Sequence, residues 1–262
     1  MEYIVICITA LFISIITLFS GFGLGTVLMP VFAIFFPLPV AIASTAVVHL
    51  ANNLFKVLLV GQLAKWSVVL KFGIPAALAS ALGAYSLGVI SMWEPIANYQ
   101  IQGHGFKVTV IGLFIGLIII LSSLFELVPK LKKLSFSPKF IPLGGVLSGF
   151  FGGISGNQGV LRSAFLIKIG LNKEEFIGTS VISSVLVDIV RLVVYGWTFS
   201  SKKFIESISA EVFGLLIAAS ITTFLGSYFG SILIHKVTFN TVQIIVGVML
   251  LMLGTAILIG FA

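Results

Sequence analysis

Four ionisable side chains interrupt long apolar stretches of the sequence: Lys56, Arg162, Asp188 and Arg191. A charge at the centre of a membrane-spanning helix costs roughly 3 kcal/mol, so each one is expected to face a protein interior or a wet cavity. Asp188 and Arg191 lie three residues apart, on one helical face, and are expected to pair. Lys56 and Arg162 then carry two positive charges with no acidic residue nearby in the sequence. Such cations in an apolar setting are suited to binding a small anion.

Glycine-rich breaks at 21–25 and 152–159 are the second part of this pattern. Glycine permits backbone conformations that interrupt a helix, and the second part of a broken helix begins with free N–H groups and a partial positive charge. We therefore expect Arg162 to lie one turn into a half-helix that points at the anion. Four glycines are the expected backbone contacts: Gly23, Gly25, Gly156 and Gly159.

Neighbouring polar residues are expected to contact the anion less directly. These are Asn53, Asn157 and Gln158, together with His49. Asp188 is expected to position Arg191. His49 and Asp188 are the candidates for carrying a coupling proton within the spans, because histidine titrates near neutral pH. The single cysteine, Cys7, excludes an intrachain disulfide and a multi-cysteine metal site, and we expect no metal and no cofactor.

A competing enzyme interpretation rests on GISG (153–156), which fits the GxSG pattern of rhomboid intramembrane serine proteases. His49 and Asn53 even have the HxxxN spacing that those enzymes use to stabilise an oxyanion. A serine nucleophile needs a histidine base within hydrogen-bond reach, and neither His104 nor His235 has the expected glycine-rich surroundings. We therefore expect no enzyme activity.

The composition requires a polytopic membrane protein. Of the 262 residues, 59% are hydrophobic and 9% charged, and the mean hydropathy is +1.22. A soluble domain of this length cannot hide so much apolar surface. Eight apolar stretches are long enough to be transmembrane helices: about 3–30, 42–62, 68–90, 106–127, 140–168, 176–198, 209–233 and 239–261. The fold class expected is all-α, with glycine-broken helices at the start of each half.

The net charge of +7 reflects lysines in the connections between spans, so it does not indicate nucleic-acid binding. With eight spans and a cytoplasmic N-terminus, the inner connections hold eight lysines: Lys65, Lys71, Lys130, Lys132, Lys133, Lys139, Lys202 and Lys203. The outer connections hold four: Lys107, Lys168, Lys173 and Lys236. This bias favours both termini on the cytoplasmic side. The three tryptophans lie near predicted span ends, as interfacial residues do: Trp66, Trp93 and Trp197.

The chain is duplicated. The stretch 43–61 aligns without gaps with 178–196, so that Asn53 matches Asp188 and Lys56 matches Arg191. Further matches follow in the same order at offsets close to 135 residues. We predict a first four-span repeat at 1–128, a basic linker at 129–139 and a second repeat at 140–262. Four spans per half give parallel halves, whereas a first span that enters and returns without crossing makes the halves inverted.

These motifs resemble the sulfite exporter TauE/SafE family over nearly the whole chain. GFGLGTVLMP (21–30), its echo GGISGNQGVLRSAFLIKIGL (152–171) and the following GTSVISSVLVDIVRLVVYG (178–196) carry the resemblance. It implies seven or eight spans from a duplicated four-span unit in the bacterial cytoplasmic membrane, and transport of sulfite or organosulfonates. The sequence departs from the family pattern at Leu24, at Asn157 and Gln158, and at Ala164, which puts sulfite itself in question.

We therefore expect a secondary transporter for a small anion such as sulfite, a sulfonate or a carboxylate, with coupling to protons left open. A passive anion channel is the alternative, because channels and carriers share positive linings. The chain has no GxxxxGK[ST] loop, which argues against ATP-driven pumping by this chain alone. The expected partners are the anion and the lipid bilayer, without nucleic acid. Direction, coupling stoichiometry and homo-oligomerisation stay open.

Overall fold

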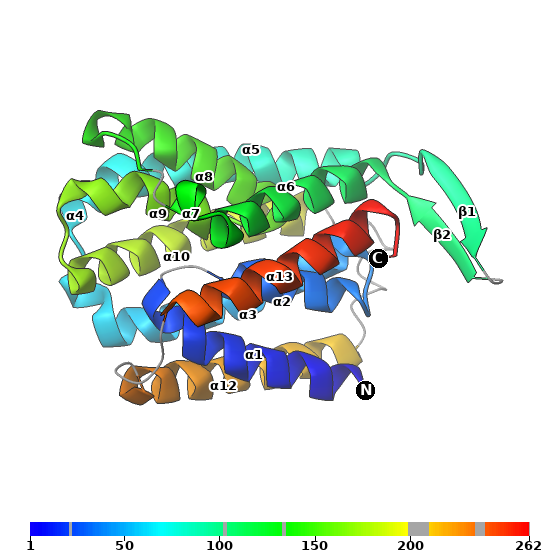
Figure 1. Cartoon of the computed structure of the whole chain (residues 1–262), viewed down its shortest axis with the longest axis horizontal. Helices are drawn as coiled ribbons and strands as arrows, with labels where there is room; N and C mark the ends of the chain where they lie inside the picture. Colours follow the sequence, from blue (N-terminus) through cyan, green and yellow to red (C-terminus); the bar gives the residue numbers. More distant parts are fainter. Residues whose placement is uncertain (21–22, 102–103, 133–134, 199–209, 234–238, 262) are drawn as a thin grey trace.

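The structure, a computed structural model, describes residues 1–20, 23–101, 104–132, 135–198, 210–233 and 239–261 (Figure 1). The first half contains α1 (Glu2–Ser20), α2 (Leu24–Ala33), α3 (Leu38–Val60), η1 (Gly61–Leu63), α4 (Trp66–Val68), the π-helical η2 (Val69–Gly73), α5 (Ile74–Ile90), β1 (Ala97–Ile101), β2 (His104–Val108) and α6 (Val110–Leu127). After α7 (Pro129–Lys132) and η3 (Pro138–Phe140), the second half contains α8 (Ile141–Ser155), α9 (Gly159–Leu166), η4 (Ile167–Ile169), α10 (Lys173–Thr198), α12 (Ala210–Leu233) and α13 (Phe239–Leu258).

Five helical segments are long and apolar enough to cross a membrane: Leu38–Leu63, Trp66–Ile90, Val110–Leu127, Lys173–Thr198 and Val212–Gly230. The 20-residue α13 packs antiparallel to α6 and so extends over the same thickness. The polytopic membrane class is therefore confirmed. Eight full crossings are not what the structure shows, because the two stretches at the start of each half are broken into helical hairpins.

The second-half hairpin consists of α8 and α9 (the α8–α9 hairpin). A Cβ atom at Gly144 would lie 2.2 Å from the ring of Phe165, and one at Gly152 would lie 2.8 Å from Cβ of Gln158. These two pairs show that α9 folds back along α8. The 15 residues of α8 are about 22 Å long, shorter than the roughly 30 Å hydrocarbon core. The hairpin therefore enters from one end of the bundle and returns to the same end.

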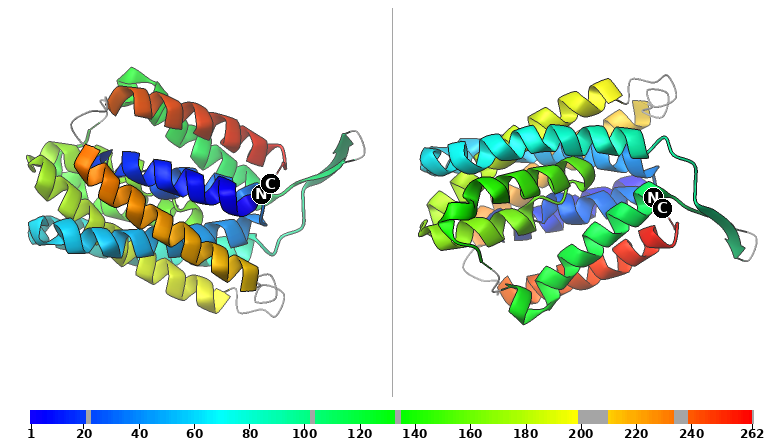
Figure 2. Two further views of the ribbon diagram at one scale, coloured as in Figure 1. Left: turned by 90° about the horizontal axis from the view of Figure 1, so that it is seen from below. Right: turned by 90° about the horizontal axis from the view of Figure 1, so that it is seen from above.

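The first-half hairpin, α1 and α2 (the α1–α2 hairpin), enters from the opposite end (Figure 1). Helix α1 packs parallel to α12, since Gly226 faces Leu11 and Gly230 faces Ile15. Helix α2 begins at the level of His49, midway along α3, and ends four residues before α3 starts. The chain thus returns to the end where it entered. Both termini lie at this end, which we call the terminal end, and the β-hairpin projects beyond it (Figure 2).

The two halves are therefore inverted relative to each other. Each half has three crossing helices after its hairpin. The second half therefore starts at the end of the bundle opposite to the terminal end, and we call this opposite end the α4 end. Of the two arrangements that the sequence left open, the structure has the inverted one, because the first stretch of each half returns without crossing. Helix α3 packs antiparallel on its repeat-mate α10, and α6 does so on α13, which places the pseudo-two-fold axis in the membrane plane.

The hairpins also interlock the halves, because α1 packs along α12 and α8 packs along α5. Glycine makes the second of these contacts close. Cβ atoms at Gly145, Gly149 and Gly153 would lie within 2.3 Å of backbone carbonyl oxygens of α5 and η2. Such small residues, four apart, allow backbones to approach in membrane bundles. The hairpin that carries Arg162 is therefore held against the first half.

A two-stranded antiparallel sheet departs from the all-α expectation. Strands β1 and β2 pair from Ala97 with Val108 through Ile101 with His104. The Phe106 ring stacks on Tyr99 and packs against Phe261, with ring centroids 5.3 and 4.6 Å apart. The sequence interpretation started the fourth span at residue 106, but residues 104–108 form strand β2 instead. The helix begins at Val110, where the Thr109 side chain accepts a bond from Gly112 N.

Candidate functional site

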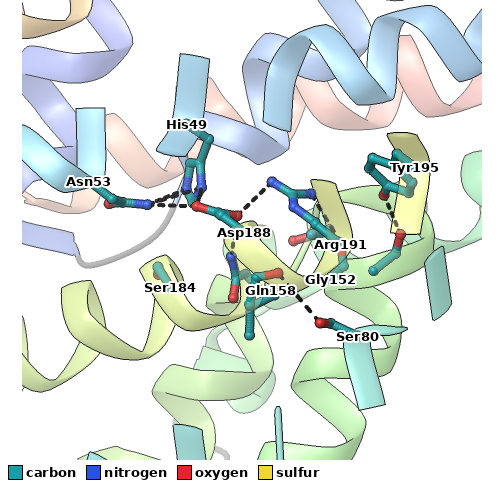
Figure 3. A network of polar contacts seen from close by, with 12 residues as sticks. His49, Asn53, Ser80, Gly152, Gln158, Ser184, Asp188, Arg191 and Tyr195 are labelled. Atoms are coloured by element: carbon teal, nitrogen blue, oxygen red, sulfur yellow. Dashed lines mark hydrogen bonds and ion pairs between the residues drawn. The ribbon is translucent and has the colours of Figure 1, made fainter. Parts of the chain in front are cut away.

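Asp188 lies at the centre of a buried polar network between α3, α9 and α10 (Figure 3). Its Oδ2 is 2.6 Å from His49 Nδ1 and accepts a bond from Asn53 Nδ2 at 3.1 Å. Its Oδ1 pairs with Arg191 Nη2 at 2.8 Å and accepts from Gln158 Nε2 at 3.3 Å. The carboxylate is thus held by groups from α3, from α10 and from the break between α8 and α9. The predicted Asp188–Arg191 pair is confirmed, and it is fully buried.

Arg191 also reaches the end of α8. Its Nη1 donates to Gly152 O at 3.1 Å, and the hydroxyl of Tyr195, one turn further along α10, donates to Gly153 O. Carbonyl oxygens at a helix C-terminus carry partial negative charge and favour a cation. Arg191 is therefore fixed on two sides, by a carboxylate and by a helix end.

Arg162 lies on α9, within the first turn after the break, as the sequence predicted. Its Nη1 donates to Ser184 Oγ at 2.5 Å, and Ser184 lies one turn before Asp188 on α10. The side chain is 2% exposed, so Arg162 faces the interior of the bundle rather than the headgroups. The guanidinium thus lies beside the Asp188 network, on the same face of α10.

Lys56 lies on α3, three residues after Asn53, and is 5% exposed. With the Asn52 amide oriented to satisfy its neighbours, Asn52 Oδ1 accepts a bond from Lys56 Nζ at 3.2 Å. Among the residues that the structure describes, Lys56 makes no ion pair. It lies close enough to Arg162 for the two cations to interact electrostatically. A long basic side chain is therefore kept inside the bundle by a neutral amide.

The tips of the two hairpins meet at the same place. A Cβ atom at Gly25 would lie 3.2 Å from Gly156 O and 3.5 Å from the His49 ring, and Thr26 Oγ1 donates to Asn157 Oδ1 at 3.1 Å. Gly23, which precedes α2, has φ +117°, and Gly156, which ends α8, has φ +79°. The N-termini of α2 and α9 therefore converge from opposite ends of the bundle.

The pseudo-two-fold axis passes through this cluster. Asn53 and Asp188 are equivalent in the two repeats, and the structure brings them into direct hydrogen-bond contact. The five ionisable members, which we call the central cluster, are His49, Lys56, Arg162, Asp188 and Arg191. With His49 neutral, three cations and one carboxylate leave a formal charge of +2. The cluster lies where two positively polarised helix ends meet, which reinforces that sign.

Most of the predicted site residues come together here, and Asn157 takes a different role. Its side chain bridges the two halves, accepting from Thr26 and donating to Ser122 of α6, rather than entering the Asp188 network. Gly23 packs against Thr17 of α1, and Gly159 is the first residue of α9. These two glycines are part of the hairpin turns. Among the described residues, no bond joins either of them to the central cluster.

Two buried residues were missed by the sequence interpretation. Ser184 binds Arg162, and the run of small polar residues in 178–184, one turn before Asp188, was the available signal. Glu126 is 3% exposed near the end of α6, packed beside Gly247 of α13. It was not singled out in the sequence, where it lies at the last turn of an apolar stretch.

The protease interpretation is not supported by the bonds of its serine. Ser155 Oγ donates to Phe151 O at 2.8 Å and accepts from Asn157 N at 3.3 Å. His49, the histidine of the HxxxN motif, is instead 2.6 Å from Asp188. Within the described residues, no bond joins Ser155 to His49 or to His104, and His235 lies outside those residues.

Comparison with known proteins gives one match. The family model described as sulfite exporter TauE/SafE matches residues 6–257, which include both hairpins and the whole central cluster. No curated protein and no solved structure matches the chain.

Proposed function

The chain belongs to the sulfite exporter TauE/SafE family, and from this premise we propose that it is a secondary transporter that moves a small anion across the membrane. The observation that carries the proposal is the central cluster: three buried cations, one carboxylate, and two helix N-termini converging from opposite ends. An anion is the ligand that this arrangement would neutralise.

Each member of the cluster has a proposed role. Arg162 and Lys56 attract the anion directly, together with backbone N–H groups at the starts of α2 and α9. Arg191 is held by Asp188 and by Gly152 O, so it supplies a fixed positive field. Gln158 and Asn53 donate to Asp188 in this closed arrangement and are the neutral groups that can turn toward a bound anion.

Alternating access follows from the inverted halves. Two hairpins that enter from opposite ends and meet at their tips form a barrier on each side of the cluster. Rocking one hairpin with its packed partner, α1 with α12 or α8 with α5, would open the cluster to one end at a time. The cluster residues are at most 8% exposed, which corresponds to the closed state of such a cycle.

Proton coupling is assigned to the His49–Asp188 pair, whose nitrogen and oxygen are 2.6 Å apart. The pair is in contact with Arg191 and Asn53, so protonation of either member would change the electrostatic balance at the anion site. Sulfite, a sulfonate or a small carboxylate are the proposed substrates, with sulfite favoured by the family description.

Because each hairpin returns to the end where it enters, several connections lie at the opposite end from the one expected for eight spans. The lysines in these connections therefore suggest the opposite orientation of the protein in the membrane. Among the described residues, seven lysines lie at the α4 end: Lys65, Lys71, Lys130, Lys132, Lys139, Lys168 and Lys173. One, Lys107, lies at the terminal end. Lys133, Lys202, Lys203 and Lys236 lie outside the described residues. We infer that the α4 end is cytoplasmic and both termini are outside.

Cysteine labelling tests this orientation. Cys7 is replaced by serine, and single cysteines are introduced as Gly105→Cys in strand β2 of the β-hairpin and Lys130→Cys at the α4 end. A Cβ atom at Gly105 meets nothing within 4 Å, so the substitution fits. A membrane-impermeant maleimide added to intact cells should label residue 105 and not residue 130. The reverse pattern would restore cytoplasmic termini.

Flux into proteoliposomes tests the transport proposal. We expect saturable uptake of sulfite or a small sulfonate that responds to an imposed pH gradient. Arg162→Gln should lower it about tenfold or more, because a hydrogen bond to a charged group contributes roughly 1.5–3 kcal/mol. Lys107→Gln removes a charge from the exposed β-hairpin and should leave uptake unchanged. A non-saturating anion current that ignores the pH gradient would make the protein a channel.

A further inference from the structure

A second basic feature lies at the α4 end, away from the central cluster. A cavity of about 690 Å³ opens there between the segment that leads into α5, the start of α8 and the turn from η4 into α10. We call it the basic-end pocket. The residues used below all line it: Lys65, Lys71, Lys139, Ile141, Ile169 and Glu175.

The pocket is positively charged. Its three lysines come from both halves of the chain, and its one acid is already engaged. Glu175 Oε2 accepts a bond from Asn172 N at 3.2 Å, while Asn172 Oδ1 accepts from Glu175 N at 2.8 Å, the reciprocal pattern of a capping box. The formal sum is +2, and the lysine side chains are flexible enough to converge on one phosphate.

The rest of the pocket is apolar and lies at the membrane surface. Ile141 and Ile169 are in its wall, together with valine, leucine and proline side chains. Trp66 and Phe140, each adjacent in sequence to lining residues, are 59% and 41% exposed. Exposed aromatic residues near helix ends are typical of the interface between hydrocarbon and headgroups. The pocket thus presents lysines to the headgroup region and aliphatic side chains to the acyl region.

We propose that the basic-end pocket binds the phosphate of an anionic phospholipid, with the lipid's glycerol and first methylenes against Ile141 and Ile169. A basic pocket between helices at the membrane surface is suited to acidic headgroups, because each lysine there gains from the anionic lipid field. Free phosphate offers the same charge but cannot use the apolar wall. The site does not depend on the anion that the central cluster carries, nor on which end is cytoplasmic.

Lipid in this pocket would also hold the moving part of the transporter. Residues 138–142 lead into α8 and residues 169–171 follow α9, so the pocket touches both ends of the hairpin that bears Arg162. Its opposite wall, Lys65 to Lys71, belongs to the first half. A bound headgroup therefore ties the α8–α9 hairpin to the first half and stabilises the closed packing.

The test uses full-length protein in a neutral detergent, with thermal unfolding and native mass spectrometry as readouts. Phosphatidylglycerol, phosphatidylcholine and inorganic phosphate are added separately. We expect phosphatidylglycerol to raise the unfolding temperature and to remain bound as one tightly held lipid. Phosphatidylcholine and inorganic phosphate should have little effect. Equal stabilisation by inorganic phosphate would make the pocket a free-anion site and overturn the lipid assignment.

Two double variants remove the same charge from different places. Lys71→Gln with Lys139→Gln takes one pocket lysine from each half, and Lys107→Gln with Lys130→Gln takes two lysines that do not line the pocket. The pocket variant should bind phosphatidylglycerol about tenfold more weakly, and the control should match the wild type. Lys65→Gln alone is the milder variant if the double does not fold. Equal binding by pocket and control variants would refute the proposal.

Discussion

The two hairpins have the same architecture and different chemistry. The α1–α2 hairpin and the α8–α9 hairpin enter from opposite ends, break at glycine and place a helix N-terminus at the centre. Beyond the break, however, α2 is apolar and fully buried, whereas α9 carries Arg162. When the glycine motifs are aligned with Pro30 opposite Ala164, Leu28 corresponds to Arg162. Both repeats thus contribute a hairpin that reaches the centre, one from each end of the bundle, while the charged side chain is found only on the hairpin of the second repeat.

The same asymmetry appears in the crossing helices. Asp188 and Arg191 of α10 correspond to Asn53 and Lys56 of α3. An inverted repeat needs equivalent backbones for its two conformations, but a site on the axis is shared by both copies and needs only one complete set of charges. Substitutions at each pair of equivalent positions test this comparison between the halves.

The largest effect is expected at Asp188. Asp188→Asn leaves Arg191 buried without its carboxylate, and breaking a buried pair in this way costs about 3–5 kcal/mol. Unfolding in detergent should therefore occur at much lower temperature. Because Asn53 donates to Asp188 directly, the double variant Asn53→Asp with Asp188→Asn returns one carboxylate to the same network. We expect it to recover part of the lost stability; no recovery would mean that the two positions are not interchangeable across the axis.

Leu28 and Arg162 should separate stability from transport. Leu28→Ala removes a fully buried side chain from the core and should cost about 2–5 kcal/mol in the free energy of unfolding. Anion affinity of the folded fraction should stay near that of the wild type. Arg162→Lys keeps a cation but loses the planar donors, so it should weaken anion binding while changing stability less. Calorimetric titration with sulfite and thermal unfolding measure the two quantities. Equal affinity losses at both positions would remove the functional contrast.

Gly23 and Gly156 should respond alike, despite the difference in charge between their hairpins. Both have φ in the left-handed half of the map, where a Cβ costs about 1–2 kcal/mol. Added Cβ atoms would also lie 2.7 Å from Thr17 and 3.1 Å from Arg191, respectively. Gly23→Ala and Gly156→Ala should each lower the unfolding temperature by several degrees. A substitution without effect in one hairpin would show that its break is not fixed by that glycine.

The sequence predicted the charges better than the path of the chain. Lys56, Arg162, Asp188 and Arg191 were identifiable because apolar surroundings make each of them costly, and the structure buries all four. The duplication was identifiable from a constant offset. Whether a broken stretch crosses or returns depends on contacts between segments distant in sequence, such as Gly144 with Phe165, and hydropathy does not contain them.

The orientation that the lysines predict depends on the number of crossings for the same reason. The positive-inside rule counts charges per connection, and the two returning hairpins reassign connections to the other end. Thr26, which donates to Asn157, could not be singled out from the sequence, since serine and threonine bind their own helix as readily as a neighbour.

The smallest effect is expected where the equivalent helices α3 and α10 begin. Helix α10 starts with the Asn172–Glu175 capping box, whereas α3 starts after Pro37 with no side-chain cap. Asn172→Ala should therefore cost about 1 kcal/mol in the free energy of unfolding. Pro37→Ala removes no cap and should cost less free energy of unfolding. The two substitutions together therefore measure how much the helix cap at the start of α10 contributes to the stability of the second half. Alanine keeps the backbone N–H from which Glu175 Oε2 accepts, so the carboxylate, which also lines the basic-end pocket, should stay engaged. The unfolding temperature with and without phosphatidylglycerol checks this: the lost cap should lower both values equally, and a smaller gain from the lipid would show that the Asn172 side chain also holds the carboxylate away from the lysines.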